Sequence, residues 1–246
     1  MKTNNFKYFV ILIFSMVLLF ASCKKDDEIG PAQVTFAFDF TVDGESLVFG
    51  ETYIINNQSV SFKTANYYIG GLRLQHSDGS TIDLSTQYLL AGLGNTATLS
   101  GDVPIGDITK AEFFVGVDPV NNTQSEDSFV SRPTNDPLGI KDPSMHWNWN
   151  TGYKFVRFDG EVDTDDDGVV DTPIAYHLGS DPLLTNMNIN KTLNLKSGEN
   201  TITFDFQLEQ FFSSVDFKNE LDTHTGNNLP LAMRLRDNLD AAITLR

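Results

Sequence analysis

The segment from Val34 to Val42 places a large apolar residue at every second position, and this pattern constrains the fold more than any other. The apolar residues are Val34, Phe36, Phe38, Phe40 and Val42, with Thr35, Asp39 and Thr41 among those between them. Since successive side chains of a strand point to opposite faces, the pattern predicts a half-buried β-strand. Asp43-Gly44 follows, as expected for the turn of a hairpin.

Further strand-like runs recur along the chain, with Gly, Asn and Asp between them. They cover residues 59–63, 67–76, 81–84, 88–90, 111–117, 153–158, 174–178, 193–195 and 201–208, and Asp78-Gly79 marks a second hairpin turn. Short strands at this spacing are typical of a β-sandwich. We therefore predict an all-β, single-domain β-sandwich.

Helical periodicity is confined to the C-terminal part of the chain. Residues 230–245 place Leu231, Leu235, Leu239 and Ala242 at spacings of three and four, which predicts a short C-terminal helix. A shorter helical turn is indicated around residues 209–215. Residues 118–144 contain four prolines and form a long loop, and a loop of this length is usually functional or disordered.

Composition excludes several classes of protein. The hydrophobic fraction of 40% is enough for a core, so global disorder is excluded. Lys and Arg number 17 against 33 Asp and Glu, and the resulting net charge of -16 argues against a nucleic-acid partner. A single cysteine excludes a disulfide framework, a cysteine-rich zinc site and a c-type haem attachment.

The N-terminal residues have the pattern of an export signal. Lys2 and Lys7 precede an uncharged, apolar run over residues 8–21, which is shorter than the about 20 apolar residues of a membrane-spanning helix. The run ends close to Cys23, and the sequence there resembles a bacterial lipobox. We predict a lipoprotein signal peptide at residues 1–22 with lipidation of Cys23. The alternative is an ordinary cleaved signal with an incidental cysteine.

The residues after Cys23 are charged and lead into the folded region. The run Lys-Lys-Asp-Asp-Glu at 24–28 resembles the acidic export signal of Bacteroidota surface lipoproteins, and its alternative interpretation is a solvated tether. We predict an acidic tether at 23–32, a β-sandwich domain at 33–246, and an outer-membrane, surface-exposed location. Several acyl chains would hold such a protein firmly to the bilayer.

Residues 145–150, Met-His-Trp-Asn-Trp-Asn, contain both tryptophans and one of four histidines. If this segment is extended, His146 and Asn148 share one face while Trp147 and Trp149 share the other. The plain alternative is that both tryptophans pack into the sandwich and His146 lies on the surface. His76 follows a strand beside the Asp78-Gly79 turn and is expected to be solvent-exposed.

Several short segments together resemble a known family. They are residues 67–74, 114–118, 136–138, 145–149, 152–155 and 177–179, followed by His224 and a helix that contains Asn238. In order and spacing they are similar to the MbnP-like family, which is related to the MopE/CorA copper proteins of methanotrophs. The resemblance covers most of the chain after the signal.

The resemblance implies a β-sandwich that binds copper through histidines. It puts His177 and His224 at histidine positions of the family, with His146 as a further ligand. It also implies that Trp147 or Trp149 is oxidised to kynurenine by a partner, a dihaem cytochrome c peroxidase-like enzyme of the MbnH type. Neutral imidazoles suit both Cu(I) and Cu(II), so the chemistry is consistent. The alternative is a family scaffold that holds no metal.

Residues 163–171 form a second, different metal signal of the form D-x-D-x-D-G-x-x-D. Oxygen atoms at alternate positions converge on one hard cation, and the glycine permits the turn. We predict a structural calcium site; its ligands are Asp163, Asp165, Asp167, the carbonyl of Val169, and Asp171. The twelfth position is Ile174 and not Glu, which predicts modest affinity. The alternative is an acidic connection between two strands.

These observations predict a lipid-anchored copper-binding protein, not an enzyme. No Gly-rich phosphate loop, nucleophile elbow or paired His-Glu zinc motif occurs in the sequence. The rival interpretation is a surface module that binds glycan or protein, with a calcium-stiffened loop. In that case Trp147 and Trp149 would stack on sugars.

Overall fold

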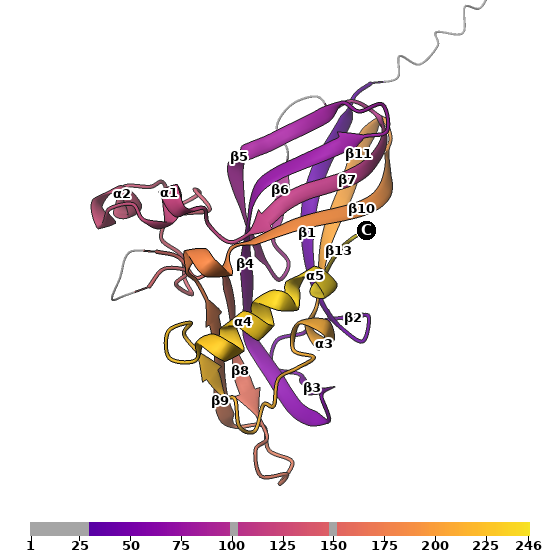
Figure 1. Cartoon of the computed structure of the whole chain (residues 1–246). Coiled ribbons are helices and arrows are strands. Elements are labelled where there is room, and N and C mark those ends of the chain that lie inside the picture. Colours follow the sequence, from indigo (N-terminus) through magenta and orange to yellow (C-terminus); the bar gives the residue numbers. More distant parts are fainter. Residues whose placement is uncertain (1–29, 99–102, 148–151) are drawn as a thin grey trace, which may run out of the picture.

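The computed structural model describes residues 30–98, 103–147 and 152–246, and they form a sandwich of two β-sheets (Figure 1). The predicted all-β sandwich with a short C-terminal helix is confirmed. The predicted signal peptide, Cys23 and most of the predicted tether lie outside these residues. None of the helices described here has the length and apolar character needed to cross a membrane.

The smaller sheet pairs the two ends of the domain. Its strands follow the order β13-β11-β1-β2, and β6 pairs with β1. The bounds are β1 Ala32–Val42, β2 Glu45–Ser46, β6 Thr96–Thr98, β11 Gly198–Gln207 and β13 Ile243–Leu245. β1 and β11 run parallel over ten residue pairs, from Ala32 opposite Gly198 to Thr41 opposite Gln207. The alternating segment of β1 therefore lies inside the sheet and not at its edge.

The larger sheet has the strand order β10-β7-β4-β8-β9-β12, and β3 and β5 also pair with β4. The bounds are β3 Thr52–Ile55, β4 Gln58–His76, β5 Thr81–Gly92, β7 Gly106–Val115, β8 Val156–Val162, β9 Thr172–Leu178, β10 Thr185–Leu195 and β12 Asp222–Thr223. Two pairs of predicted runs are each one strand, β4 and β5, because β-bulges interrupt the alternation without ending the pairing.

Aromatic side chains fill the space between the sheets. Phe40 of β1 contacts Tyr67 of β4 and Phe206 of β11, with ring centroids 5.9 and 5.6 Å apart. Tyr67 therefore faces the smaller sheet, and Tyr68 faces the opposite side of β4. On that outer side Tyr68 contacts Tyr153 edge to face and donates a hydrogen bond to the carbonyl of Pro137.

The segment between β7 and β8 accordingly covers part of the outer face of the larger sheet. It contains two short helices, α1 Pro119–Asn122 and α2 Glu126–Val130, capped by the side chains of Asp118 and Ser125. Tyr153 lies near the end of this segment, and its hydroxyl donates a hydrogen bond to the carbonyl of Leu138 in the same segment. The long proline-containing loop predicted here is thus an ordered outer layer.

The C-terminal helix is shorter than predicted. α4 spans Leu229–Asp237, a second short helix α5 spans Leu239–Ala242, and Ile243–Leu245 forms β13. β13 pairs antiparallel with β11 and buries Ile243 and Leu245 at the sheet edge. Residues 243–245 therefore form a strand and do not continue the helix, because strand pairing buries these two side chains. The remaining helical elements of the described residues are α3 Leu208–Phe211, which overlaps the helical turn expected around residues 209–215, and the 3-10 helix η1 Asp181–Leu183.

The expectation for His76 was wrong. Its exposed fraction is 5%, because β4 continues through it and pairs it with Ile108 of β7. The turn at Asp78-Gly79 begins only after this pairing, so proximity to the turn does not expose the ring.

Candidate metal centre

Strand register brings two histidines from distant parts of the sequence together. β12 pairs parallel with β9, with Asp222 opposite Ala175 and Thr223 opposite Tyr176. The next residue along the chain is His224, directly after β12, on one side and His177 of β9 on the other. Their imidazole rings lie 4.7 Å apart, centroid to centroid, and cross at 80°. Two imidazoles at this separation can bind one metal ion between them.

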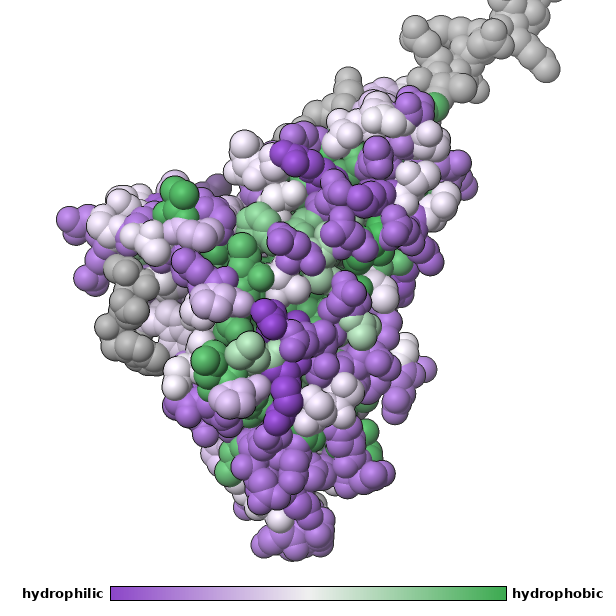
Figure 2. All heavy atoms as spheres, viewed as in Figure 1, coloured by the Kyte–Doolittle hydropathy of each residue, from purple (hydrophilic) through white to green (hydrophobic). Residues whose placement is uncertain are grey.

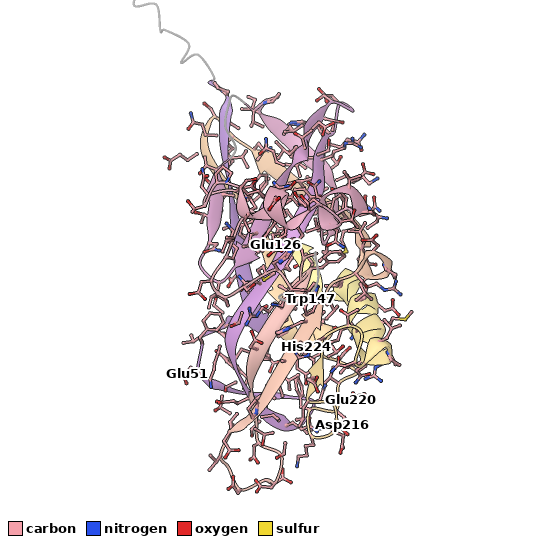
Figure 3. All side chains as sticks on the ribbon, turned by 90° about the vertical axis from the view of Figure 1, so that its left-hand side faces the viewer. Glu51, Glu126, Trp147, Asp216, Glu220 and His224 are labelled. Carbon is pink, nitrogen blue, oxygen red and sulfur yellow. The ribbon has the colours of Figure 1, made fainter. Side chains whose placement is uncertain are left out.

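Trp147 lies beside both histidines. Its ring centroid is 6.2 Å from that of His177 and 6.4 Å from that of His224. Figure 3 shows Trp147 and His224 as neighbours in front of the strands of the larger sheet. The indole is 7% exposed, so it is a wall of the site and not a surface ring.

A short antiparallel pairing positions the indole. The backbone N–H of Trp147 donates to the carbonyl of Gly152, and that of Lys154 donates to the carbonyl of Met145. Gly179 at the end of β9 leaves room for this segment: a Cβ there would lie 2.2 Å from the carbonyl oxygen of Tyr153 and 3.1 Å from Nε1 of Trp147. The absence of a side chain at Gly179 is therefore necessary for the packing of the indole.

His177 is held by a carboxylate on the neighbouring strand. Its Nε2 lies 2.7 Å from Oδ1 of Asp159, and Nε of Arg157 donates to the other oxygen at 2.5 Å. Burial tends to raise the pKa of Asp159, but the hydrogen bonds from His177 and Arg157 lower it to about 2. Asp159 is therefore a permanent anion that fixes the orientation of the His177 ring.

The other nitrogen of His177 is the strongest sign of a ligand. Burial lowers the pKa of His177, against the opposing effect of Asp159, so the neutral ring is favoured at neutral pH. With Nε2 donating its proton to Asp159, Nδ1 carries a lone pair. That Nδ1 is buried and has no hydrogen-bond partner among residues 30–98, 103–147 and 152–246. A buried imidazole nitrogen without a partner is costly unless something binds it, and the donor fits copper.

The loop that carries His224 is tied to β9. The hydroxyl of Thr225 donates to the carbonyl of His177 and accepts from the N–H of Gly179, at 3.1 and 2.9 Å. The N–H of His224 donates to Oδ1 of Asn227 at 2.6 Å, and its Nδ1 is 3.4 Å from Oδ2 of Asp222. His224 is more open than His177, with a side chain 36% exposed. The pair thus has one buried member and one that faces solvent.

His146 is not brought to this pair. Its ring stacks on Phe129, with centroids 3.9 Å apart, and lies edge-on to Tyr153 at 5.4 Å. Its Nε2 accepts the N–H of Gly152 at 3.2 Å. Alternation along the extended segment sends His146 and Trp147 to opposite sides, as the sequence indicated. The second predicted tryptophan, Trp149, lies outside the described residues.

Lys154 supplies a cation beside the indole. Its Nζ lies 5.2 Å from the centre of the Trp147 ring and donates to the carbonyls of Ser144 and His146. Burial and the neighbouring charge of Arg157 lower the pKa of Lys154 to about 8. Sequence reasoning did not find Lys154, Asp159 or Thr225 as parts of the site. Arg157 lies on the strand predicted at 153–158 and Asp159 directly follows that run, so the available signal was continued alternation, which puts both side chains on one face.

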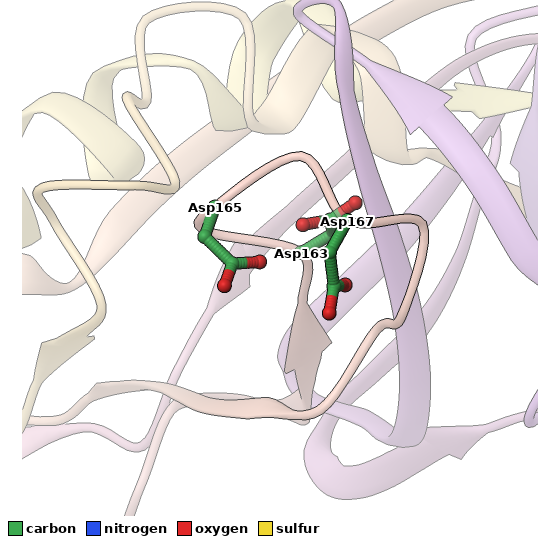
Figure 4. Close-up of side chains that lie close together, drawn as sticks. All are labelled: Asp163, Asp165 and Asp167. Carbon is green, nitrogen blue, oxygen red and sulfur yellow. The ribbon is translucent and has the colours of Figure 1, made fainter.

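The aspartate loop between β8 and β9 brings three of its predicted ligands together. Carboxylate oxygens of Asp163, Asp165 and Asp167 lie within 4.8 Å of one another (Figure 4). Asp163 is buried, and its two oxygens accept the N–H groups of Asp166 and Gly168. The predicted ligand Asp171 is not in this group. The carbonyl of Val169 stays a prediction. The loop is at the hydrophilic lower tip of the molecule in Figure 2.

Among residues 30–98, 103–147 and 152–246, the aspartate cluster is the only group of three or more His, Cys, Asp or Glu side chains close enough to share a metal ion. The histidine pair therefore has no third ligand of these types within the described part of the chain. Any further ligand to a metal at the pair would come from elsewhere.

Comparison with known proteins gives two matches. A family model described as MbnP matches residues 31–229, a range that includes both histidines, Trp147 and the aspartate loop. Among solved structures, MbnP from Methylosinus trichosporium is similar, with a TM-score of 0.51 and 17% identity over 76% of this chain and 79% of that chain. At that identity the likeness concerns the fold alone. No curated protein sequence matches the chain.

Proposed function

Because a family model covers most of its length, this chain belongs to the MbnP family, and we propose that it is a binding protein that holds copper between His177 and His224. The family resemblance inferred from the sequence is confirmed, and membership supports a metal-related role in general. The choice of copper rests on the donor set, because two neutral imidazoles without a thiolate suit Cu(I) and Cu(II).

The observation that carries the proposal is the buried Nδ1 of His177. It has no hydrogen-bond partner within the described part of the chain, while Asp159 fixes the opposite nitrogen and so aligns the ring. A histidine that ligates a metal commonly donates its other N–H to a carboxylate in this way. Asp159 and His177 therefore have the arrangement of a metal ligand and its supporting group.

We also propose that Trp147 is the residue that a partner enzyme oxidises to kynurenine. Trp147 borders both histidines, and the aromatic amine of kynurenine can ligate a metal where the indole nitrogen cannot. The oxidant would be supplied by a dihaem cytochrome c peroxidase-like partner of the MbnH type. The indole C2–C3 bond is cleaved by oxidation and the C2 carbon leaves as formate. The net change is the gain of one oxygen and the loss of one carbon, so the mass of the peptide that contains Trp147 reports it directly.

The experiment is copper binding by purified protein with and without the two imidazoles. His177→Ala and His224→Ala should each lower copper affinity by at least about tenfold, the effect expected for loss of one ligand bond worth 1.4 kcal/mol or more. His146→Gln is the matched control, since His146 lies in a separate aromatic cluster. Unchanged copper affinity in both alanine variants would refute the site, whereas a loss in His146→Gln would place copper at a different set of ligands.

The aspartate loop supports a second, structural metal. Calcium binds oxygen ligands at about 2.3–2.6 Å, so two oxygens on opposite sides of one ion are about 5 Å apart. The carboxylate oxygens of Asp163, Asp165 and Asp167 lie within 4.8 Å of one another, which is compatible with that separation. We propose that calcium binds here and draws the three carboxylates together without taking part in copper binding.

For its location, we propose a lipoprotein anchored through Cys23 to the outer membrane and exposed at the cell surface. The support is the sequence of residues 8–28 alone. Mass analysis of the N-terminal peptide from the native host would test it, because lipidation adds acyl chains to the cysteine. A free thiol at Cys23 would contradict the anchor.

The rival use of Trp147 as a platform for sugars finds no support in the geometry. Its exposed fraction of 7% leaves no open ring face for a sugar to stack upon.

A further inference from the structure

The outer face of the larger sheet carries a groove of about 630 Å³ that is separate from both candidate metal sites. It lies over β4, β5, β7 and β10, and its lining includes Arg73, Ser85, Glu112, Phe114, Asn186 and Asn188. Its volume is within the range of about 300–1,000 Å³ that is common for small-molecule sites. Phe113, the neighbour of Phe114, contacts Phe204 in the core, so Glu112 and Phe114 project to the outer side.

Strand register arranges the lining in two rows across the sheet. In one row Glu112 of β7 stands between Asn188 of β10 and Arg73 of β4. In the other row Phe114 stands between Asn186 of β10 and Gly70 of β4. An aromatic ring thus lies next to a line of polar side chains, and both are fixed on strands of the scaffold.

Two glycines allow the ring of Phe114 to lie flat on the sheet. A Cβ at Gly70 would come within 2.4 Å of the Phe114 ring, and one at Gly71 within 2.6 Å. Tyr88 contacts the same ring edge-on, with centroids 6.1 Å apart. One face of Phe114 therefore covers Gly70 and Gly71 while the ring also lines the groove. Glycines inside a strand often mark such a close approach.

The polar groups of the groove have unused hydrogen-bonding capacity. Within the described part of the chain, the side-chain amides of Asn186 and Asn188 are exposed and make no hydrogen bond to another protein group, whereas Ser85 hydrogen-bonds to Asp83. Arg73 is paired with Asp83, and Glu112 with Lys110. An amide both donates and accepts hydrogen bonds, so the groove suits a ligand that does the same.

Charge narrows the class of ligand. The carboxylates of Glu112 and Asp118 outnumber the single guanidinium of Arg73 in the lining, and the whole chain has a net charge of -16. An anionic ligand such as a phosphate or a uronic acid would be repelled. A purely apolar ligand would cover the amides of Asn186 and Asn188 without offering them a hydrogen-bond partner. A neutral polyol with apolar ring faces is not repelled by the negative charge, and its hydroxyls can hydrogen-bond to the polar side chains.

We propose that this groove binds a neutral oligosaccharide, with a sugar ring packed on Phe114 and its hydroxyls bonded to Asn186, Asn188 and Glu112. The site is independent of the proposed copper pair and needs no metal. A peptide added as an extra strand would bond to the backbone edge of β10, and so would not depend on these side chains.

Calorimetric titration of the full chain, in a detergent without a sugar headgroup, tests the proposal. The probes are cellohexaose, xylohexaose, mannohexaose and laminarihexaose, with an alginate hexamer as the anionic comparison. At least one neutral probe should bind, and Phe114→Ala should abolish that binding. Asn188→Ala should weaken it about tenfold, as expected when a well-formed hydrogen bond to ligand is lost.

Two control variants and the thermal stability of one test variant keep the test decisive. Phe114→Tyr preserves the ring and should retain binding, and Phe49→Ala removes an exposed aromatic residue outside the groove and should change nothing. Asn188 is exposed, so its alanine variant should melt like the wild type even if Phe114→Ala does not fold. Failure of all four neutral probes at millimolar concentration overturns the proposal. Binding of the alginate alone, or binding unaffected in Asn188→Ala and Phe114→Ala, does so too.

Discussion

The ring centroids of His177 and His224 lie 4.7 Å apart because the parallel pairing of β12 with β9 sets Thr223 opposite Tyr176, and a histidine is the next residue along each chain segment. β12 is only two residues long, and its pairing with β9 is the feature that sets His224 opposite His177. Thr225 then bonds to the backbone on both sides of Leu178, which holds the loop in place. The site therefore depends on a short strand and one hydroxyl as much as on its histidines.

The carboxylate of Asp159 should control copper affinity without touching the metal. Asp159→Asn removes the anion that accepts the His177 N–H, so we expect copper affinity to fall about 10- to 100-fold. Copper titration of the folded variant measures this. The matched control is Glu161→Gln on the same strand, whose carboxylate pairs with Lys63 instead. Equal affinity in wild type and Asp159→Asn would show that the carboxylate does not support a ligand.

Two aspartates of the loop should affect stability in different ways: Asp163 through the fold of the loop itself, and Asp165 only when calcium is bound. Asp163→Asn disturbs two partly buried hydrogen bonds, from the N–H groups of Asp166 and Gly168, and should lower the free energy of unfolding by about 1–3 kcal/mol even with a chelator present. Asp165 is exposed, so Asp165→Asn should have no such effect. It should instead reduce the gain in melting temperature on adding calcium. Thermal melts of both variants with calcium or chelator give the comparison, and a wild type that does not respond to calcium would refute the metal.

Gly179 should be intolerant of any side chain. Gly179→Ala places a methyl group 2.2 Å from the carbonyl oxygen of Tyr153, so we expect a loss of about 1–3 kcal/mol in the free energy of unfolding. The strain should also shift the indole of Trp147, and tryptophan fluorescence reports this. Gly226→Ala is the control, because a Cβ there meets no atom within 4 Å. Equal urea midpoints for both variants would contradict the close packing at Gly179.

How far the sequence predicts this molecule depends on the range of the contacts. Alternation in β1 and the turns after it are local properties, and they predict the sandwich well. The distance between His177 and His224 depends on the register of β12 with β9, which no local pattern contains. The family resemblance supplied both residues, and only the structure brings them side by side. The C-terminal helix is present, but its end was predicted too late in the chain for the same reason, since residues 243–245 form β13 by pairing with β11.

The burial of His146 and His76 could not be predicted from the sequence. Each is a lone histidine beside a turn or an aromatic run, and sequence alone does not say which elements cover it. His146 stacks on Phe129 from the covering segment, and His76 is closed in by β7. Both environments arise from contacts between elements far apart in the sequence.

Asp118 gives a prediction about pH that is remote from either metal site. Burial tends to raise its pKa, but hydrogen bonds from Tyr88, Asn121 and the N–H of Val120 together lower the pKa below its usual value. A carboxyl whose pKa is lower in the folded state contributes stability above its unfolded pKa of 3.8, and the contribution is lost as the pH falls through the folded value. Protonation of Asp118 at low pH should therefore lower the free energy of unfolding of the wild type.

Asp118→Asn should accordingly be less stable than wild type at pH 7, by about 1–2 kcal/mol for a charge-assisted hydrogen bond, and the difference should shrink below pH 4. Urea unfolding at pH 7, 5 and 3 measures the difference directly. Tyr88→Phe removes one of the donors, so it should raise the pKa of Asp118 and move the loss of stability to higher pH. A difference between wild type and Asp118→Asn that stays constant from pH 7 to 3 would show that the charge of Asp118 does not stabilise the fold, because only a titrating group makes that difference depend on pH.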